Sequence, residues 1–97
     1  MNGLERAWAE ELAKRKAVGE ILWFRYEGIA LRLADGARYT PDFALMFADG
    51  TLELHEVKAF WAEAARLRIK VAAELFPFRF LAVRRGPKNA GWQLEEF

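Results

Sequence analysis

The sequence contains no cysteine and no serine, and its single histidine is His55. The absence of cysteine excludes disulfides, thiolate zinc sites and a cysteine nucleophile, and the absence of serine excludes serine-nucleophile hydrolysis. A single histidine excludes mechanisms and metal sites that need two histidines from one chain. The side chains that remain for catalysis are carboxylates and lysine, acting with a metal ion.

Long apolar runs are also missing. The longest run in the first half of the chain covers residues 43–48, which is far too short to cross a bilayer. Glu5 and Arg6 bring charge close to the first residue, which a secretory signal would not have. We therefore expect residues 1–97, of which 54% are hydrophobic, to form a single domain with its own core, in the cytoplasm and away from membranes.

Positive charge gathers in the second half of the chain, although the net charge is only +1. Residues 66–94 contain a single acidic side chain, Glu74. The basic residues of this range are Arg66, Arg68, Lys70, Arg79, Arg84, Arg85 and Lys88. A basic half beside an acidic centre suits a polyanion such as nucleic acid, and the alternative is a solvated basic surface without a ligand.

Two helices are predicted from apolar spacing. Apolar residues recur every four positions over residues 3–18, and Asn2 followed by Glu5 has the spacing of a capping box. An alanine-rich second helix is expected over residues 62–76, ended by Pro77. Its apolar stripe consists of Leu67, Val71 and Leu75.

Strands are predicted where apolar residues alternate between turn signals, and residues 84–91 have the composition of a loop. The expected strands are 21–26, 29–33, 38–47, 52–58, 78–83 and 92–97. Pro41 requires an edge position or a local irregularity in its strand. The second helix joins strand 52–58 to strand 78–83, so these two should be parallel. The expected class is α/β, with the order helix–antiparallel β-meander–helix–strand around a small mixed sheet.

Residues 41–58 predict a β-hairpin with three ionisable side chains near its open end. Residues two apart in a strand share a face, so Glu56 and Lys58 lie together. A two-residue turn would put Asp42 on the other face, whereas a three-residue turn ending at Gly50 puts it beside Glu56. Three-residue hairpins commonly place glycine in the left-handed region, so we predict this form.

Asp42, Glu56 and Lys58 then form a constellation suited to phosphodiester hydrolysis. Two carboxylates are the hard oxygen ligands that Mg²⁺ or Mn²⁺ prefers. Such an ion polarises a phosphoryl oxygen and lowers the pKa of bound water, while Lys58 orients the water or stabilises charge in the transition state. The alternative is structural: Asp42 caps a turn, and Glu56 and Lys58 form an exposed ion pair.

The dipeptide PD at residues 41–42, followed by EVK at residues 56–58, resembles the signature of the PD-(D/E)XK nuclease superfamily. The longer strings YTPDF at residues 39–43 and ELHEVK at residues 53–58 are similar to small phage-type members. The resemblance covers roughly residues 3–84. It implies a restriction-endonuclease-like core and an origin in a phage or prophage within a bacterial host.

The resemblance also implies an activity, that of a Mg²⁺-dependent deoxyribonuclease. Asp42, Glu56 and the backbone carbonyl of Val57 would hold Mg²⁺ or Mn²⁺, and Lys58 would be the catalytic lysine. Many members add a glutamate from the first helix, and Glu5 is the matching position, either as a ligand or as a helix cap. Small phage members include Holliday-junction resolvases, so branched or junction DNA and a homodimer are expected.

Basic residues after the lysine strand often contact DNA in that superfamily. The residues expected to bind nucleic acid are Arg66, Lys70, Arg84 and Arg85. His55 should point away from Glu56 by alternation and is expected to be structural. Trp61 is expected in the core, with base stacking as the alternative. Two other functions stay open: a non-catalytic nucleic-acid-binding or assembly module on the same fold, and a protein-interaction domain.

Overall fold

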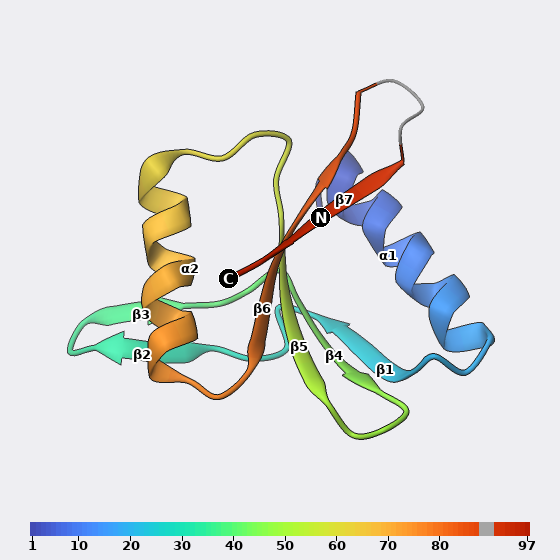
Figure 1. Ribbon diagram of the computed structural model, residues 1–97, viewed down its shortest axis with the longest axis horizontal. Helices are drawn as coiled ribbons and strands as arrows, with labels where there is room; N and C mark the ends of the chain where they lie inside the picture. Colours follow the sequence, from blue (N-terminus) through green and yellow to red (C-terminus); the bar gives the residue numbers. More distant parts are fainter. Residues whose placement is uncertain (88–90) are drawn as a thin grey trace.

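A five-stranded mixed sheet lies between two helices in the computed structural model, which describes residues 1–87 and 91–97 (Figure 1). The elements in chain order are α1 (Gly3–Ala17), β1 (Ile21–Tyr26), β2 (Leu31–Ala34), β3 (Ala37–Tyr39), β4 (Phe43–Phe47), β5 (Leu52–Val57), α2 (Glu63–Leu75), β6 (Arg79–Arg85) and β7 (Trp92–Glu96). The sheet order is β1-β4-β5-β6-β7, and β5 runs parallel to β6 as expected. The mixed α/β class is therefore confirmed. The expected loop 84–91 begins later than predicted, because β6 continues through Arg85. The centre of this loop, with Lys88, lies outside the described residues.

Helix α1 covers one face of the sheet through Trp8 and Leu12, which are fully buried. Their partners from the strands are Ile21, Phe43, Leu45, Val57 and Val83. The helix begins with the predicted capping box: Glu5 N–H donates to Asn2 Oδ1 at 2.8 Å, and Asn2 N–H donates to Glu5 Oε1 at 2.7 Å. The cap satisfies free N–H groups of the first turn and fixes where α1 starts.

Helix α2 covers the opposite face, but with a different stripe from the predicted one. Ile69 and Ala72 are buried against the sheet, whereas Leu67, Val71 and Leu75 are exposed. Residues 62–76 carry two apolar stripes, and the alanine-containing one allows the helix to approach the sheet more closely. Leu67, Val71 and Leu75 do share one side of α2, as predicted from their spacing, but this side faces solvent and not the sheet.

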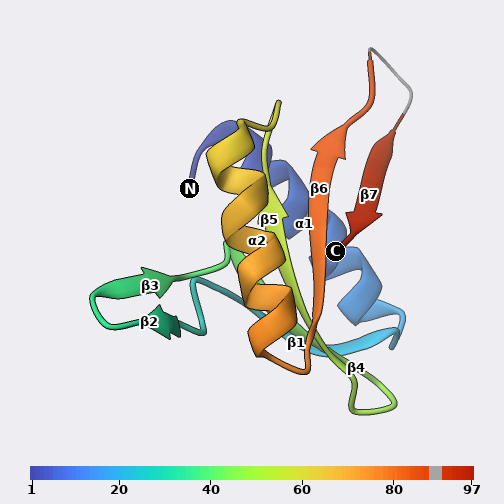
Figure 2. The same ribbon diagram turned by 60° about the vertical axis from the view of Figure 1, so that its left-hand side comes forward.

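The predicted strand 38–47 is wrong in one respect, because it is broken into β3 and β4 around Pro41. Proline has no N–H for a strand ladder, and the chain turns there. Strands β2 and β3 form a separate two-stranded hairpin, so the predicted meander is interrupted between β1 and β4. Leu31 and Tyr39 of this hairpin pack into the core beneath α2, and Figure 2 shows the hairpin projecting from the sheet beside that helix.

A buried polar chain joins α1 to the centre of the sheet. Trp8 Nε1–H donates to His55 Nδ1 at 3.1 Å, and His55 Nε2 lies 2.8 Å from Glu53 Oε1. Since the indole only donates, Nδ1 is unprotonated and the proton of the neutral ring is on Nε2. Glu53 Oε2 meets Arg79 Nη1 at 2.7 Å, and Arg79 also pairs with Glu96. Burial lowers the pKa of His55, against the raising effect of Glu53. His55 is therefore structural and faces away from Glu56, as predicted.

Replacing Trp8 by phenylalanine should leave His55 Nδ1 without its donor. We expect Trp8→Phe to lower the free energy of unfolding by about 2–4 kcal/mol, through an unpaired buried acceptor and lost ring volume. Trp61 is the matched control, because its buried Nε1–H has no acceptor within hydrogen-bond range among the described residues. Trp61→Phe should cost about 1 kcal/mol or less. Urea unfolding at equilibrium measures both, and equal losses would contradict the role given to the Trp8 hydrogen bond.

Candidate metal centre

The β4–β5 hairpin places Asp42 and Glu56 on the same face of the sheet. Phe43 pairs with His55 and Ala44 with Leu54, a register that sets Asp42 opposite Glu56. The turn has three residues: Phe47 N–H donates to the Thr51 carbonyl at 2.8 Å, and Gly50 N–H donates to the Phe47 carbonyl at 2.9 Å. Gly50 has a φ of 90°, which lies in the left-handed region. The predicted turn and register are confirmed.

Pro41 lies opposite Val57 by the same register, at the end of β4. The N–H and C=O of Val57 both point toward this neighbour. The Val57 N–H donates to Asp42 Oδ2 at 2.8 Å, while Pro41 has no N–H to offer to the Val57 carbonyl. The Val57 carbonyl therefore faces the end of β4 beside Asp42, where no strand N–H is available to it.

The Glu56 carboxylate is held through one oxygen. Glu56 Oε1 accepts from the Tyr39 hydroxyl at 3.1 Å and from the Asp42 N–H at 3.2 Å. Glu56 Oε2 lies 3.7 Å from Lys58 Nζ. The Lys58 side chain is 45% exposed, whereas that of Glu56 is 13% exposed. The largely buried Glu56 carboxylate therefore lies next to the more exposed Lys58 ammonium, at the open end of this face.

Electrostatics set these carboxylates apart from ordinary surface acids. Burial raises the pKa of Asp42 to about 7, helped by the negative charges of Glu56 and Glu5 and opposed by the Val57 N–H and Lys58. Burial also raises the pKa of Glu56, against Lys58 and the Tyr39 hydrogen bond. No cationic side chain of residues 1–87 and 91–97 lies within ion-pair distance of Asp42. Asp42 therefore has no cationic partner of its own among the described residues, and a bound cation would supply one.

Glu5 reaches the same region from the other side of the sheet. Its Oε1 accepts from Asn2 N–H and, at 3.4 Å, from the Tyr26 hydroxyl. Its charge contributes to the raised pKa of Asp42. The described part of the chain contains no group of three histidine or acidic side chains gathered closely enough to hold a metal ion. Glu5 is therefore a helix cap in this structure, and its role as a ligand stays a prediction.

The four basic residues predicted to bind nucleic acid are divided between the two faces of the sheet. Arg66 forms a two-pronged pair with Glu95 at 2.9 and 2.7 Å. This Arg66 bond lowers the pKa of Glu95, and Arg84 and Lys70 add to the effect, so three of the four residues gather there. The guanidinium of Arg85 instead lies 4.7 Å from the ring centre of Trp92, on the α1 side.

Two residues of the site carried no role in the sequence-based reasoning. Tyr39 orients Glu56, and burial followed by the nearby Glu56 charge raises the pKa of its hydroxyl. The positive charge of Arg68 acts on both Tyr39 and Glu56 from α2. The position of Tyr39 depends on the strand break at Pro41, and that of Arg68 depends on which side of α2 packs on the sheet. Local residue spacing predicts neither feature.

Comparisons of the chain with protein-family models, with curated proteins and with solved structures gave no match. The described residues contain no helix that is long and apolar enough to span a bilayer. Function is therefore inferred from the geometry and charge of this site.

The raised pKa of Asp42 predicts how stability depends on pH without metal. Between the ordinary aspartate pKa of 3.8 and about 7, the folded state holds a proton that the unfolded state has lost, so ionised Asp42 costs stability as pH rises. We expect Asp42→Asn to raise the free energy of unfolding by about 1–3 kcal/mol near pH 8, with the gain shrinking toward about pH 4. Asparagine can still accept from the Val57 N–H.

Thermal and urea unfolding in EDTA across this range measures the effect. The control is Asp35→Asn in the exposed turn between β2 and β3, which should show no gain that grows with pH. If Asp42→Asn changes stability equally at both ends of the range, the Asp42 carboxyl is not strained by its surroundings.

Proposed function

We propose that this protein is a metal-dependent endonuclease that hydrolyses DNA phosphodiester bonds. The observation that supports it is a pair of largely buried carboxylates, Asp42 and Glu56, on one face with Lys58. Among the described residues, Asp42 has no cation within ion-pair distance. An ordinary exposed ion pair would leave both groups solvated. Raised pKa values at converging groups are typical of functional sites.

The donor set fits Mg²⁺ or Mn²⁺. Asp42 and Glu56 each have one carboxylate oxygen outside the hydrogen bonds described above, and the register directs the Val57 carbonyl toward the end of β4, next to Asp42. Magnesium is commonly held by one or two carboxylates and keeps several waters, so three protein oxygens suffice. Glu5 is the candidate for a further oxygen ligand. When bound, the ion would polarise a phosphoryl oxygen and lower the pKa of water.

Other residues of the site have roles in stabilising charge and in positioning Glu56. Lys58, at the open end of the face, donates to the attacking water or to a phosphoryl oxygen as charge develops there. Tyr39 and the Asp42 N–H are positioning groups, because they fix the Glu56 carboxylate through Oε1. Arg68 adds positive charge from α2.

Nucleic acid fits the surroundings of Lys58. The parallel register of β5 and β6 sets Lys58 beside Arg84, since Val57 pairs with Val83. Arg84 lines a hollow of about 260 Å³ together with Trp61, Gln93 and Glu95. A phosphate next to the scissile one would meet Arg84 there. The preference for branched or junction DNA, and a phage or prophage origin, rest on the sequence resemblance alone.

We also propose a homodimer formed through α2. Leu67 and Leu75 are 61% and 53% exposed and lie one turn either side of the half-exposed Val71. If two copies pack α2 antiparallel around Val71, Leu67 of one meets Leu75 of the other. The same arrangement brings Lys70 beside Glu74 of the second copy, so charge as well as shape is complementary.

Cleavage tests the proposed activity. With Mg²⁺ or Mn²⁺ the protein should cut supercoiled plasmid and synthetic four-way junctions, and EDTA should stop it. We expect Asp42→Ala, Glu56→Gln and Lys58→Ala each to slow cutting by about 100-fold or more. The controls Asp35→Ala and Lys16→Ala change exposed residues of the same types and should cut normally.

Unchanged cutting by both Asp42→Ala and Lys58→Ala would contradict the assignment. Salt-sensitive DNA binding without any metal-dependent cutting would support the non-catalytic binding module instead.

Light scattering after size-exclusion chromatography tests the dimer. We expect a dimer mass for the wild type and a monomer mass for Val71→Glu, because a buried unpaired charge at the centre costs about 2 kcal/mol or more. Lys70→Glu should weaken association, and adding Glu74→Lys to it should restore the dimer. Val18→Glu, at an exposed position after α1, is the apolar control and should keep the wild-type mass. A monomeric wild type would contradict the proposal.

A further inference from the structure

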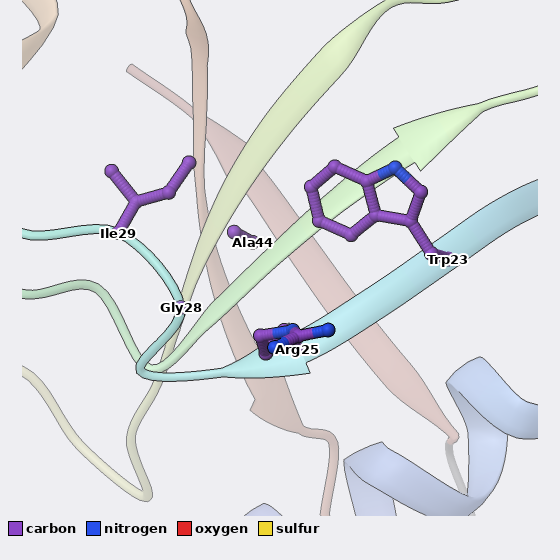
Figure 3. Close-up of a pocket in the computed structure, with 5 residues that line it drawn as sticks. All are labelled: Trp23, Arg25, Gly28, Ile29 and Ala44. Atoms are coloured by element: carbon purple, nitrogen blue, oxygen red, sulfur yellow. The ribbon is translucent and has the colours of Figure 1, made fainter.

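A second hollow, of about 450 Å³, lies on the same face of the sheet as the carboxylates. It is lined by Trp23, Arg25, Gly28, Ile29 and Ala44 (Figure 3). Figure 3 shows the indole of Trp23 and the side chain of Ile29 on either side of Ala44, with Arg25 on the β1 side. This volume lies within the range of about 300–1,000 Å³ that is common for small-ligand sites.

The shape of the hollow follows from how the chain leaves β1. Glu27 has a φ of 49°, and its N–H donates to the Asp42 carbonyl at 2.8 Å. Gly28 then passes so close to Arg25 that a Cβ atom added to it would lie 2.9 Å from Arg25 Cβ. The small side chain of Ala44 leaves the floor open. The segment after β1 thus forms one wall of the hollow and is tied to the residue that carries the proposed metal ligand.

The lining combines apolar walls with one unpaired cation. Trp23 and Ile29 belong to the apolar core beneath α2 but remain partly exposed. Within residues 1–87 and 91–97, no carboxylate lies within ion-pair distance of the exposed Arg25. An aromatic face beside an arginine is the combination that binds a base by stacking and its phosphate by charge.

The hollow also lies next to the proposed metal ligand Asp42, on the same face of the sheet. Arg25 pairs with Ala44 across β1 and β4, and Ala44 lies two residues beyond Asp42 on the same face. Two residues of a strand span about 6.6 Å, so the hollow adjoins Asp42 on this face of the sheet. A nucleotide in the hollow would therefore lie close along the DNA strand to a phosphate held between Asp42 and Lys58.

We propose that this hollow binds one unpaired nucleotide of the DNA strand that is cut, with its base between Trp23 and Ile29 and its phosphate on Arg25. The proposal rests on the proposed nuclease function and specifies its substrate. A base within a duplex has both faces stacked on neighbours, so it cannot also stack on Trp23. The protein should therefore prefer DNA in which single-stranded nucleotides adjoin the cut.

Binding without metal tests the hollow separately from catalysis. Fluorescence anisotropy in EDTA compares a forked duplex with single-stranded arms against a blunt duplex of the same length. We expect Arg25→Ala and Trp23→Leu to weaken binding of the fork by about 5- to 150-fold, with little change for the blunt duplex. Trp23→Phe, which keeps an aromatic face, should retain most of the affinity.

The matched control is Arg38→Ala, which removes an exposed arginine of β3 and should bind both DNAs as the wild type does. Circular dichroism and thermal unfolding show whether each variant is folded. If Trp23→Leu does not fold, Arg25→Ala and Trp23→Phe still test the proposal. A 5-bromouracil at a single unpaired position should crosslink to the peptide containing Trp23. Equal losses on fork and blunt DNA, no loss on either, or crosslinking only to other peptides would overturn the proposal.

The two proposals fail in different ways. If the fork preference depends on Arg25 but no DNA is cut with Mg²⁺ or Mn²⁺, the nucleotide site stands and the nuclease assignment falls. If Asp42→Ala abolishes cutting while Arg25→Ala leaves fork and blunt DNA bound and cut alike, the nuclease assignment stands and the nucleotide site falls.

Discussion

The hydrogen bond from the Val57 N–H to Asp42 Oδ2 closes the β4–β5 hairpin at the point where its backbone ladder stops. The Val57 N–H donates to a side-chain carboxylate where the ladder would use a backbone carbonyl, and Pro41, opposite Val57, has no N–H to donate to the Val57 carbonyl. The proposed site depends on this side-chain hydrogen bond, because it holds Asp42 at the end of the hairpin. The register delivers Glu56 to the same place, and the helices packed on both faces hold the hairpin in that register.

Glu53 and Glu56, three positions apart in β5, differ in how their negative charge is compensated. Glu53 is buried on the α1 side, where Arg79 and His55 both meet its carboxylate. Glu56, on the α2 side, has only a longer contact with Lys58, and its neighbour Asp42 has no cation at ion-pair distance among the described residues. Glu53 is thus a buried carboxylate with a structural role, because its negative charge is paired within the fold. This contrast supports the proposal that Asp42 and Glu56 bind a cation.

Much of this arrangement could be predicted because strand parity is strict. One glycine position fixed the turn length, the turn length fixed the faces, and alternation separated His55 from Glu56. The exposed stripe of α2 could not be predicted, since residues 62–76 offer two apolar stripes and the sheet selects between them. Tyr39 and the hollow at Trp23 also escaped prediction, because both are created where the β2–β3 hairpin leaves the main sheet, and this departure is decided by long-range packing.

The short turn at Gly50 has a consequence for the order in which the protein folds. The contact between Asp42 and Glu56 spans only 14 residues, whereas the contact between Trp8 and His55 spans 47. Contacts between nearby residues close at a smaller loss of chain entropy, so the hairpin can form before α1 docks. The two carboxylates would then meet early in folding, in a chain that has not yet assembled its core. If the pair binds a divalent cation as proposed, metal bound at that stage would stabilise the hairpin before the core forms.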